Sequence, residues 1–139
     1  YHRLPDAGMM SDKAEPAPKP ARVTGSRHLF AATGYSLSGV RRLWAEAAFR
    51  HEVLGGAVSL ALLIALRVPL RDIAVFAVLY LILIAAEALN TAIEEVVDHL
   101  APQWAQFAKH AKDLGSLAVF CLLCANGIYL AAIILPVVF

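Results

Sequence analysis

Three long apolar stretches constrain this chain more than any other feature of its sequence. They cover residues 46–66, 72–97 and 114–138. A helix needs about 20 mainly apolar residues to cross a bilayer. The first stretch has an uncharged core of only 14 residues, 53–66, so its helix is expected to begin earlier, with Glu46, Arg50 and Glu52 at the membrane edge. Because 60% of the 139 residues are hydrophobic and only 17% are charged, so short a chain cannot bury its apolar surface in a core of its own. The sequence therefore predicts an all-α integral membrane fold with three transmembrane helices.

The part of the chain before the first apolar stretch divides into two segments. Residues 1–26 contain four prolines, scattered charges and no apolar run, so we expect a disordered tail and no secretory signal peptide. Residues 1–8 precede two methionines and are expected to be an extension outside the fold. Residues 28–44 carry apolar side chains at a roughly helical spacing beside two arginines, which is typical of an amphipathic helix on the membrane surface. Residues 27–139 are thus expected to form one membrane domain.

The distribution of basic residues predicts the orientation in the membrane. Ten of the 12 Lys and Arg residues lie before or at the edge of the first span, or between the second and third spans. The connection between the first two spans holds the other two, Arg67 and Arg71. Connections rich in Lys and Arg stay on the cytoplasmic side, so we expect a cytoplasmic N-terminus.

A stripe of polar side chains lies inside the second apolar stretch, where hydrocarbon should exclude it. At about 100° per residue, one helix face carries Glu87, Asn90, Thr91, Glu94 and Asp98, with Glu95 off its centre. Carboxylates inside a membrane are costly and usually mark function. One alternative is that the helix ends near residue 86 and leaves the acids in water, but residues 73–86 are too few to cross a bilayer.

The spacing of these acids suits two different tasks. Glu87 and Glu94 point the same way about 10 Å apart along a helix, which fits a deeper general base and a shallower metal ligand. Mg²⁺ usually takes one or two carboxylates together with substrate phosphates, and Glu46 at the edge of the first span is a natural second ligand. Lys112 and Asp113, just before the third span, are expected at the same depth. The role of Asp98 stays open between ion pairing and catalysis, and that of Glu95 between solvent and nucleotide.

The position of the stripe along the second apolar stretch also argues against some classes of function. It enters the membrane from one side and stops, whereas an ion path needs polar groups through the whole thickness. Neither a P-loop nor a protein-kinase signature is found in the sequence. This pattern fits a lipid head group that meets a water-soluble reactant.

Four motifs at these positions resemble the prokaryotic diacylglycerol kinase family. They are Gly34-Tyr35-Ser36, Glu46-Ala47-Ala48-Phe49-Arg50, the block from Glu87 to Asp98, and Ala111-Lys112-Asp113-x-Gly115-Ser116. The resemblance runs from about His28 to the C-terminus. It implies a homotrimer with active sites shared between subunits, located in the bacterial inner membrane. The implied reaction is phosphorylation of 1,2-diacylglycerol to phosphatidic acid by ATP with Mg²⁺, without nucleic acid.

The resemblance also implies a role for each matching residue. Glu87 matches the general base, and Glu46 and Glu94 match the ligands of the metal that accompanies ATP. The positions that match nucleotide contacts are Tyr35, Glu46, Asn90, Glu94, Lys112 and Asp113. Those that match positions near the lipid are Trp44, Arg50, Glu52, Glu87 and Ser116. Two features depart from the family: His28 stands where an arginine is common, and the segment from Tyr35 to Glu46 is one residue shorter.

Two other functions remain open from the sequence. Relatives with the same motifs phosphorylate undecaprenol, so an undecaprenol kinase is the nearest alternative. A non-enzymatic membrane subunit or ion carrier is the second, and lipid-stimulated ATP turnover would distinguish it from a kinase. Trp104, Tyr80 and Tyr129 are expected to be packing or interface anchors, and Gly55-Gly56 to allow two helices to approach closely.

Overall fold

The computed structural model describes residues 26–138, which form four helices. These are α1 (Ser26–Leu43), α2 (Ala47–Ala65), α3 (Leu70–Leu100) and α4 (Gln106–Val138). No strand occurs among the described residues, and α2, α3 and α4 are each long and apolar enough to cross a membrane. The prediction of an all-α fold with three such helices is confirmed. The expected disordered tail lies almost wholly outside the described residues.

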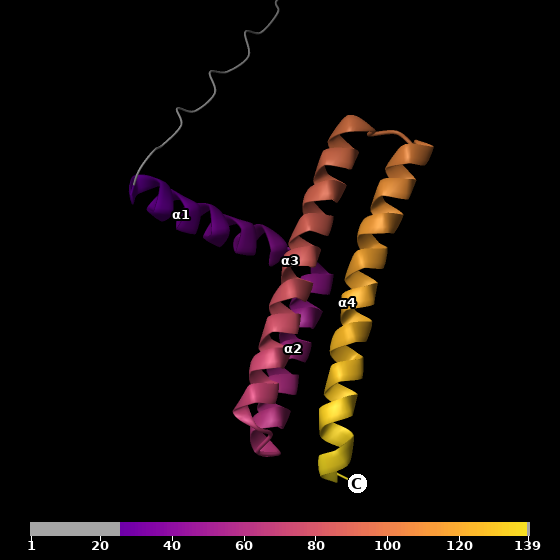
Figure 1. Cartoon of the computed structure of the whole chain (residues 1–139). Helices are drawn as coiled ribbons and strands as arrows, with labels where there is room; N and C mark the ends of the chain where they lie inside the picture. The colour runs from indigo at the N-terminus through magenta and orange to yellow at the C-terminus, as the bar shows by residue number, and fades with distance from the viewer. Residues whose placement is uncertain (1–25, 139) are drawn as a thin grey trace, which may run out of the picture.

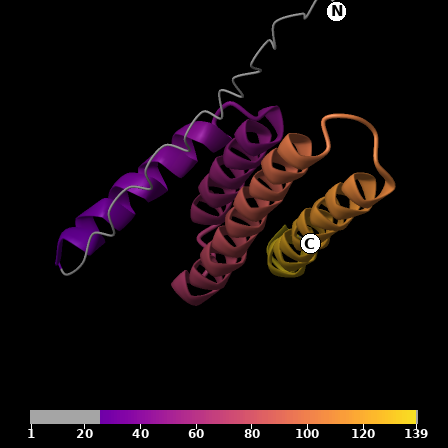
Figure 2. The same ribbon diagram turned by 90° about the horizontal axis from the view of Figure 1, so that it is seen from above.

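The three long helices form a bundle from which α1 projects. α3 and α4 run side by side in opposite directions, and α2 lies against α3 (Figure 1). Seen from above, α1 extends away to one side of the bundle (Figure 2). Both α3 and α4 continue past the level at which α1 joins, toward their own connection (Figure 1).

Helix α1 carries exposed apolar side chains, as the surface-helix prediction requires. Leu37 and Val40 are exposed, while the side chain of Phe30 lies outside the described residues. The helix ends in basic residues, Arg41 and Arg42. A helix with this combination can lie on a membrane with its apolar side chains in the lipid boundary and its arginines near the head groups.

The turn between α2 and α3 is defined by a left-handed residue. Arg67 has φ 54°, and its N–H donates to the carbonyl of Ile64, while Val68 N–H donates to the carbonyl of Leu63. This pair of bonds is a Schellman motif, which satisfies carbonyl groups at the end of a helix. Its hydrophobic contact is present too, since Val68 and Leu63 belong to one buried cluster with Phe76.

Gly56 lets α2 approach α3 at the level of Tyr80. A Cβ on Gly56 would lie 2.4 Å from the Tyr80 ring, whereas a Cβ on Gly55 would meet nothing within 4 Å. The Tyr80 hydroxyl donates to the Glu52 carbonyl at 3.0 Å. The expected close approach is therefore made by Gly56 alone, and Tyr80 is a packing residue that ties the two helices together.

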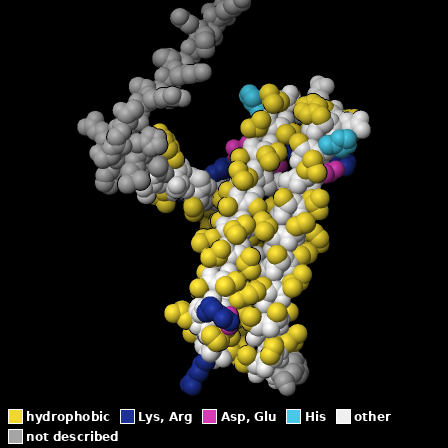
Figure 3. All heavy atoms as spheres, viewed as in Figure 1, with side chains coloured by type: hydrophobic (Ala, Val, Ile, Leu, Met, Phe, Trp, Pro, Cys, Tyr) yellow, Lys and Arg dark blue, Asp and Glu magenta, His cyan; other side chains and the backbone are white. Residues whose placement is uncertain are grey.

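The outer surface of the bundle is apolar between its two ends. Hydrophobic side chains cover its middle, and charged side chains gather above and below them (Figure 3). Large side chains such as Leu62, Leu81 and Phe120 are exposed on the three long helices. In water so much exposed apolar surface would cause aggregation, so these faces fit lipid or further protein.

The bounds of α3 exclude one alternative that the sequence left open, a helix that ends early and leaves the acids in water. α3 continues without a break from Leu70 to Leu100, so the helix does not end near residue 86, and the polar stripe is helical throughout. α4 begins at Gln106, eight residues before the expected span. Lys112 and Asp113 therefore project from a helix rather than from a loop.

Candidate active site

A cavity of about 330 Å³ between α2, α3 and α4 collects most of the predicted acids. Its polar lining consists of Glu46, Glu52, Glu87, Asn90, Thr91, Glu94 and Ser116. We call this cavity the acidic groove. The polar stripe of α3 supplies four of these residues, because that face of α3 turns toward both neighbouring helices.

The deepest polar residues of the acidic groove are well buried. Glu87 is 5% exposed, Thr91 7% and Asn90 9%. Asn90 Nδ2 donates to Glu94 Oε1 at 3.0 Å, so the amide orients that carboxylate. Among the side chains that the structure describes, those of residues 33–138, none forms a hydrogen bond with the Glu87 carboxylate. An unpaired carboxylate in so sheltered a place is expensive, and its lone pairs are available to a substrate.

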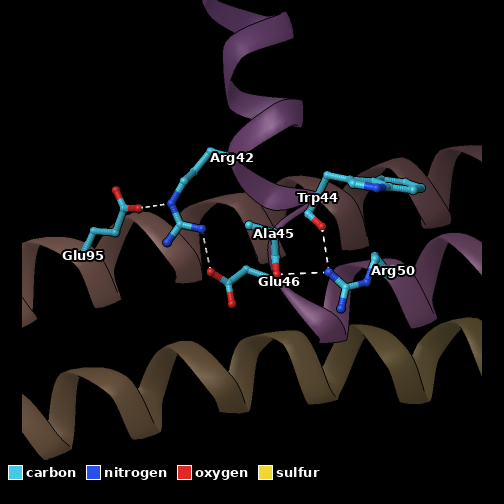
Figure 4. Close-up of polar contacts among 6 residues, drawn as sticks. All are labelled: Arg42, Trp44, Ala45, Glu46, Arg50 and Glu95. Atoms are coloured by element: carbon cyan, nitrogen blue, oxygen red, sulfur yellow. Dashed lines mark hydrogen bonds and ion pairs between the residues drawn. The ribbon is translucent and has the colours of Figure 1, made fainter.

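Glu46 lies at the outer edge of the acidic groove and is held by an arginine. It precedes the first residue of α2 with extended backbone and makes no side-chain capping bond. Arg42 Nη1 contacts Glu46 Oε1 at 2.6 Å, and Arg42 Nε donates to Glu95 (Figure 4). These two carboxylates raise the pKa of Arg42. Sequence reasoning missed this role of Arg42, although its i, i+4 spacing to Glu46 was a usable signal.

Arg50 and Trp44, expected near the lipid, make contacts at the junction between α1 and α2. Arg50 Nη1 donates to the carbonyls of Trp44 and Ala45, at 2.9 and 3.1 Å (Figure 4). The Trp44 ring meets Phe49 edge-on, with ring centroids 6.2 Å apart. Neither side chain lines the acidic groove. Within one chain their contacts are structural.

Lys112 and Asp113 lie in a second cavity, near the connection between α3 and α4. This cavity, the connection groove, is about 490 Å³ and is also lined by Asp98, Trp104 and Lys109. Lys112 Nζ pairs with Asp98 at 2.5 Å, and Lys109 Nζ pairs with Asp113 at 2.5 Å. The structure thus assigns Asp98 an ion pair. Within one chain, neither Lys112 nor Asp113 lines the cavity that holds Glu46 and Glu94.

Tyr35, also expected at the nucleotide, is separate from both cavities. It lies on α1 and is 73% exposed. Neither the acidic groove nor the connection groove includes it among its lining residues. A single chain therefore divides the predicted nucleotide residues among three places.

An apolar cavity of about 480 Å³ adjoins the acidic groove on the membrane side. The two cavities share Ala48, Glu52 and Leu123. We call it the apolar groove. Deep within it lies Asn126, 6% exposed, which donates to the carbonyls of Leu79 and Leu122 at 3.3 and 2.9 Å. Sequence reasoning missed Asn126, the one amide side chain in the third apolar stretch.

Comparison with known proteins gives one consistent family. The family model described as "Prokaryotic diacylglycerol kinase" matches residues 34–135. The chain belongs to the prokaryotic diacylglycerol kinase family. This confirms the resemblance stated from the motifs, and with it the prediction of an enzyme rather than a non-enzymatic subunit.

Individual relatives agree with this assignment to the diacylglycerol kinase family. A diacylglycerol kinase of Sinorhizobium sp is 47% identical over 112 residues, which cover 81% of this chain and 82% of that protein. One of Escherichia coli is 40% identical over 101 residues, with coverages of 69% and 80%. One of Haemophilus influenzae is 36% identical over 108 residues, covering 77% and 92%. The matches therefore extend over most of each relative.

The Mg²⁺ that the kinase family implies fits the acidic groove by donor type. Among the described side chains of residues 33–138, no three His, Cys, Asp or Glu residues lie close enough to hold a metal ion by themselves. Mg²⁺ usually needs only one or two carboxylates when substrate phosphates complete its ligands. Glu46 and Glu94 line the same cavity and supply two. The donor set fits a metal that arrives together with a phosphate substrate.

Proposed function

We propose that this chain is an ATP-dependent diacylglycerol kinase that makes phosphatidic acid at the cytoplasmic face of the bacterial inner membrane. The observation that carries the proposal is that two cavities lie side by side and share lining residues. Glu52 lines both the acidic groove and the apolar groove, so a lipid can keep its acyl chains among apolar side chains while its hydroxyl reaches the carboxylates.

The proposed reaction is a direct transfer within the acidic groove. The Glu87 carboxylate accepts the proton of the lipid hydroxyl as that oxygen attacks the γ-phosphorus of ATP, and the bond to the β-phosphate oxygen breaks to release ADP. Burial of Glu87 excludes competing water, and Glu52 and Ser116 beside it offer hydrogen bonds to the glycerol.

The other acids of the groove serve the phosphates. Glu46 and Glu94 would hold Mg²⁺, which when bound neutralises phosphate charge. Asn90 keeps the Glu94 carboxylate in place through its 3.0 Å bond. Arg42 contacts Glu46 and so places a positive charge at this end of the groove.

Sharing of the site between subunits of a homotrimer is part of the proposal. Tyr35 and Lys112 do not line the acidic groove of their own chain, and the long helices expose wide apolar faces. Packing of copies through these faces would bring a neighbour's nucleotide-binding residues to the groove. Mixed oligomers of a Glu87→Gln chain and a Lys112→Ala chain test this. Activity above that of either variant alone supports shared sites, and no gain contradicts them.

The substrate is tested with purified protein in mixed detergent micelles and γ-labelled ATP. Diacylglycerol, undecaprenol and a lipid-free control are compared, each with Mg²⁺ and with excess chelator. We expect labelled phosphatidic acid only when diacylglycerol and Mg²⁺ are both present. A higher kcat/KM for undecaprenol would overturn the substrate, and equal ATP turnover without lipid would overturn lipid kinase activity.

A further inference from the structure

At Gly115 the α4 backbone comes close to the polar stripe of α3. A Cβ on Gly115 would lie 2.1 Å from Asn90 Oδ1 and 3.2 Å from Asn90 Cγ. Atoms of neighbouring side chains do not approach so closely, so only a glycine fits opposite Asn90 in this arrangement. Asn90 is itself buried between the helices, which limits its freedom to move away.

Among the described glycines, only Gly56, which faces Tyr80, meets a similar requirement. Four other glycines in the described helices, Gly34, Gly39, Gly55 and Gly127, have nothing within 4 Å of an added Cβ. Glycine inside a helix is less favourable than alanine by about 1 kcal/mol. Gly115 lies well inside α4, and the close contact with Asn90 offsets this cost by leaving room for the amide.

The orientation of the Asn90 amide connects this contact to the acidic groove. Nδ2 donates to Glu94 Oε1, and Oδ1 faces the space beside Gly115 without a hydrogen-bond partner among the described residues. A Cα–H group is a weak donor to such an oxygen. A methyl group on residue 115 would occupy that space, turn the amide, and break its bond to Glu94.

We propose that Gly115 is a positioning residue: its bare backbone holds the Asn90 amide in the orientation that directs the Glu94 carboxylate into the acidic groove. The proposal deepens the proposed function and rests on it, because it gives Glu94 its place beside metal and phosphate. Gly115 itself touches neither substrate nor metal.

The test is a double-mutant cycle between Gly115→Ala and Asn90→Ala, with Gly39→Ala as the control for adding a methyl group to a helical glycine. Each variant is measured for kcat and KM, for the Mg²⁺ concentration giving half-maximal rate, and for thermal unfolding without metal. We expect Gly115→Ala to lower the rate about tenfold or more, as for loss of one hydrogen bond to a charged group, and to raise the Mg²⁺ requirement. Gly39→Ala should match the wild type.

The double variant decides the route by which the methyl group acts. If Gly115 works through Asn90, the double variant equals Asn90→Ala in rate, Mg²⁺ requirement and unfolding temperature. Independent, additive effects overturn the proposal, as does a Gly115→Ala enzyme with unchanged Mg²⁺ dependence. If Gly115→Ala does not fold, removal of the Asn90 amide must restore folding, and failure to do so also overturns it.

The outcomes separate this inference from the proposed function. A wild-type protein that phosphorylates no lipid refutes the proposed function, while the metal-free unfolding cycle still measures the coupling of Gly115 to Asn90. An active wild type with an additive cycle refutes the positioning role alone.

Discussion

Two positions on α3, each ten residues from one end of the helix, use the same packing device for different purposes. Toward the connection with α4, Gly115 leaves room for Asn90, and toward the connection with α2, Gly56 leaves room for Tyr80. The polar group of Tyr80 bonds to a backbone carbonyl, that of Glu52. The amide of Asn90 bonds to a carboxylate, Glu94. The two contacts therefore differ in the hydrogen-bond acceptor, which is a neutral backbone carbonyl for Tyr80 and a charged carboxylate for Asn90.

The hydrogen-bond partner of a polar side chain distinguishes a structural residue from a functional one in this bundle. A side chain that bonds to helix carbonyls ties two helices together and leaves no charge to neutralise, as with Tyr80 and Asn126. A buried carboxylate without a partner, such as Glu87, destabilises the protein, so its presence indicates a functional role. Substitutions at the two ends should therefore affect different properties.

The largest expected effect is at the active-site end. Glu87→Gln keeps the shape of the side chain but cannot accept the hydroxyl proton, so we expect kcat to fall by about 10²- to 10⁴-fold with the unfolding temperature unchanged or raised. Initial rates with labelled ATP measure the loss, and thermal unfolding is the control. If this variant phosphorylates lipid at nearly the wild-type rate, Glu87 is not the general base.

Gly56→Ala is the matching change at the opposite end. The added Cβ would lie 2.4 Å from the Tyr80 ring, and overpacking of this kind is destabilising by about 1–2 kcal/mol after the gain in helix propensity. We expect the main effect to be a lower free energy of unfolding. The rate per folded molecule should change little. Denaturation in detergent together with an active-fraction assay checks this. The comparison fails if the rate falls further than for Gly115→Ala.

Arg42→Ala tests the edge of the acidic groove. Loss of the arginine removes positive charge that competes with Mg²⁺ for Glu46, so the half-saturating Mg²⁺ concentration should fall by about two- to fivefold. The effect should shrink at high salt, since the side chain is accessible to solvent. Arg41→Ala is the matched control. If Arg42→Ala raises the Mg²⁺ requirement and Arg41→Ala does not, Arg42 and Mg²⁺ do not compete for Glu46.

The smallest expected effect is at the turn between α2 and α3. Arg67 has φ 54°, a conformation that glycine adopts without steric strain. Arg67→Gly should stabilise the protein by about 0.5 kcal/mol, because relief of strain is partly offset by the greater freedom of the unfolded chain. Activity should not change. Arg71→Gly, a change inside helix α3, is the control and should destabilise.

Much of the fold followed from local patterns, whereas the composition of the site did not. The stripe from Glu87 to Glu94 needs only the helical period, so it was predictable and is observed to line one cavity. Glu46, Glu52 and Ser116 join it because particular faces of α2 and α4 meet α3. Lys112 was expected at the same depth as the acids, and within its own chain it pairs with Asp98 and does not line their cavity. Depth in a membrane does not fix the direction in which a side chain projects.

The sequence by itself determined three membrane-crossing helices and a polar face on the second, because hydrophobic length and the 3.6-residue period are properties of single segments. The tertiary structure alone decided that Arg50 closes the α1–α2 junction, that Arg42 holds Glu46, and that Gly115 lies over Asn90. These pairings depend on the rotation and spacing of whole helices against one another. No single helix carries that information in its own pattern.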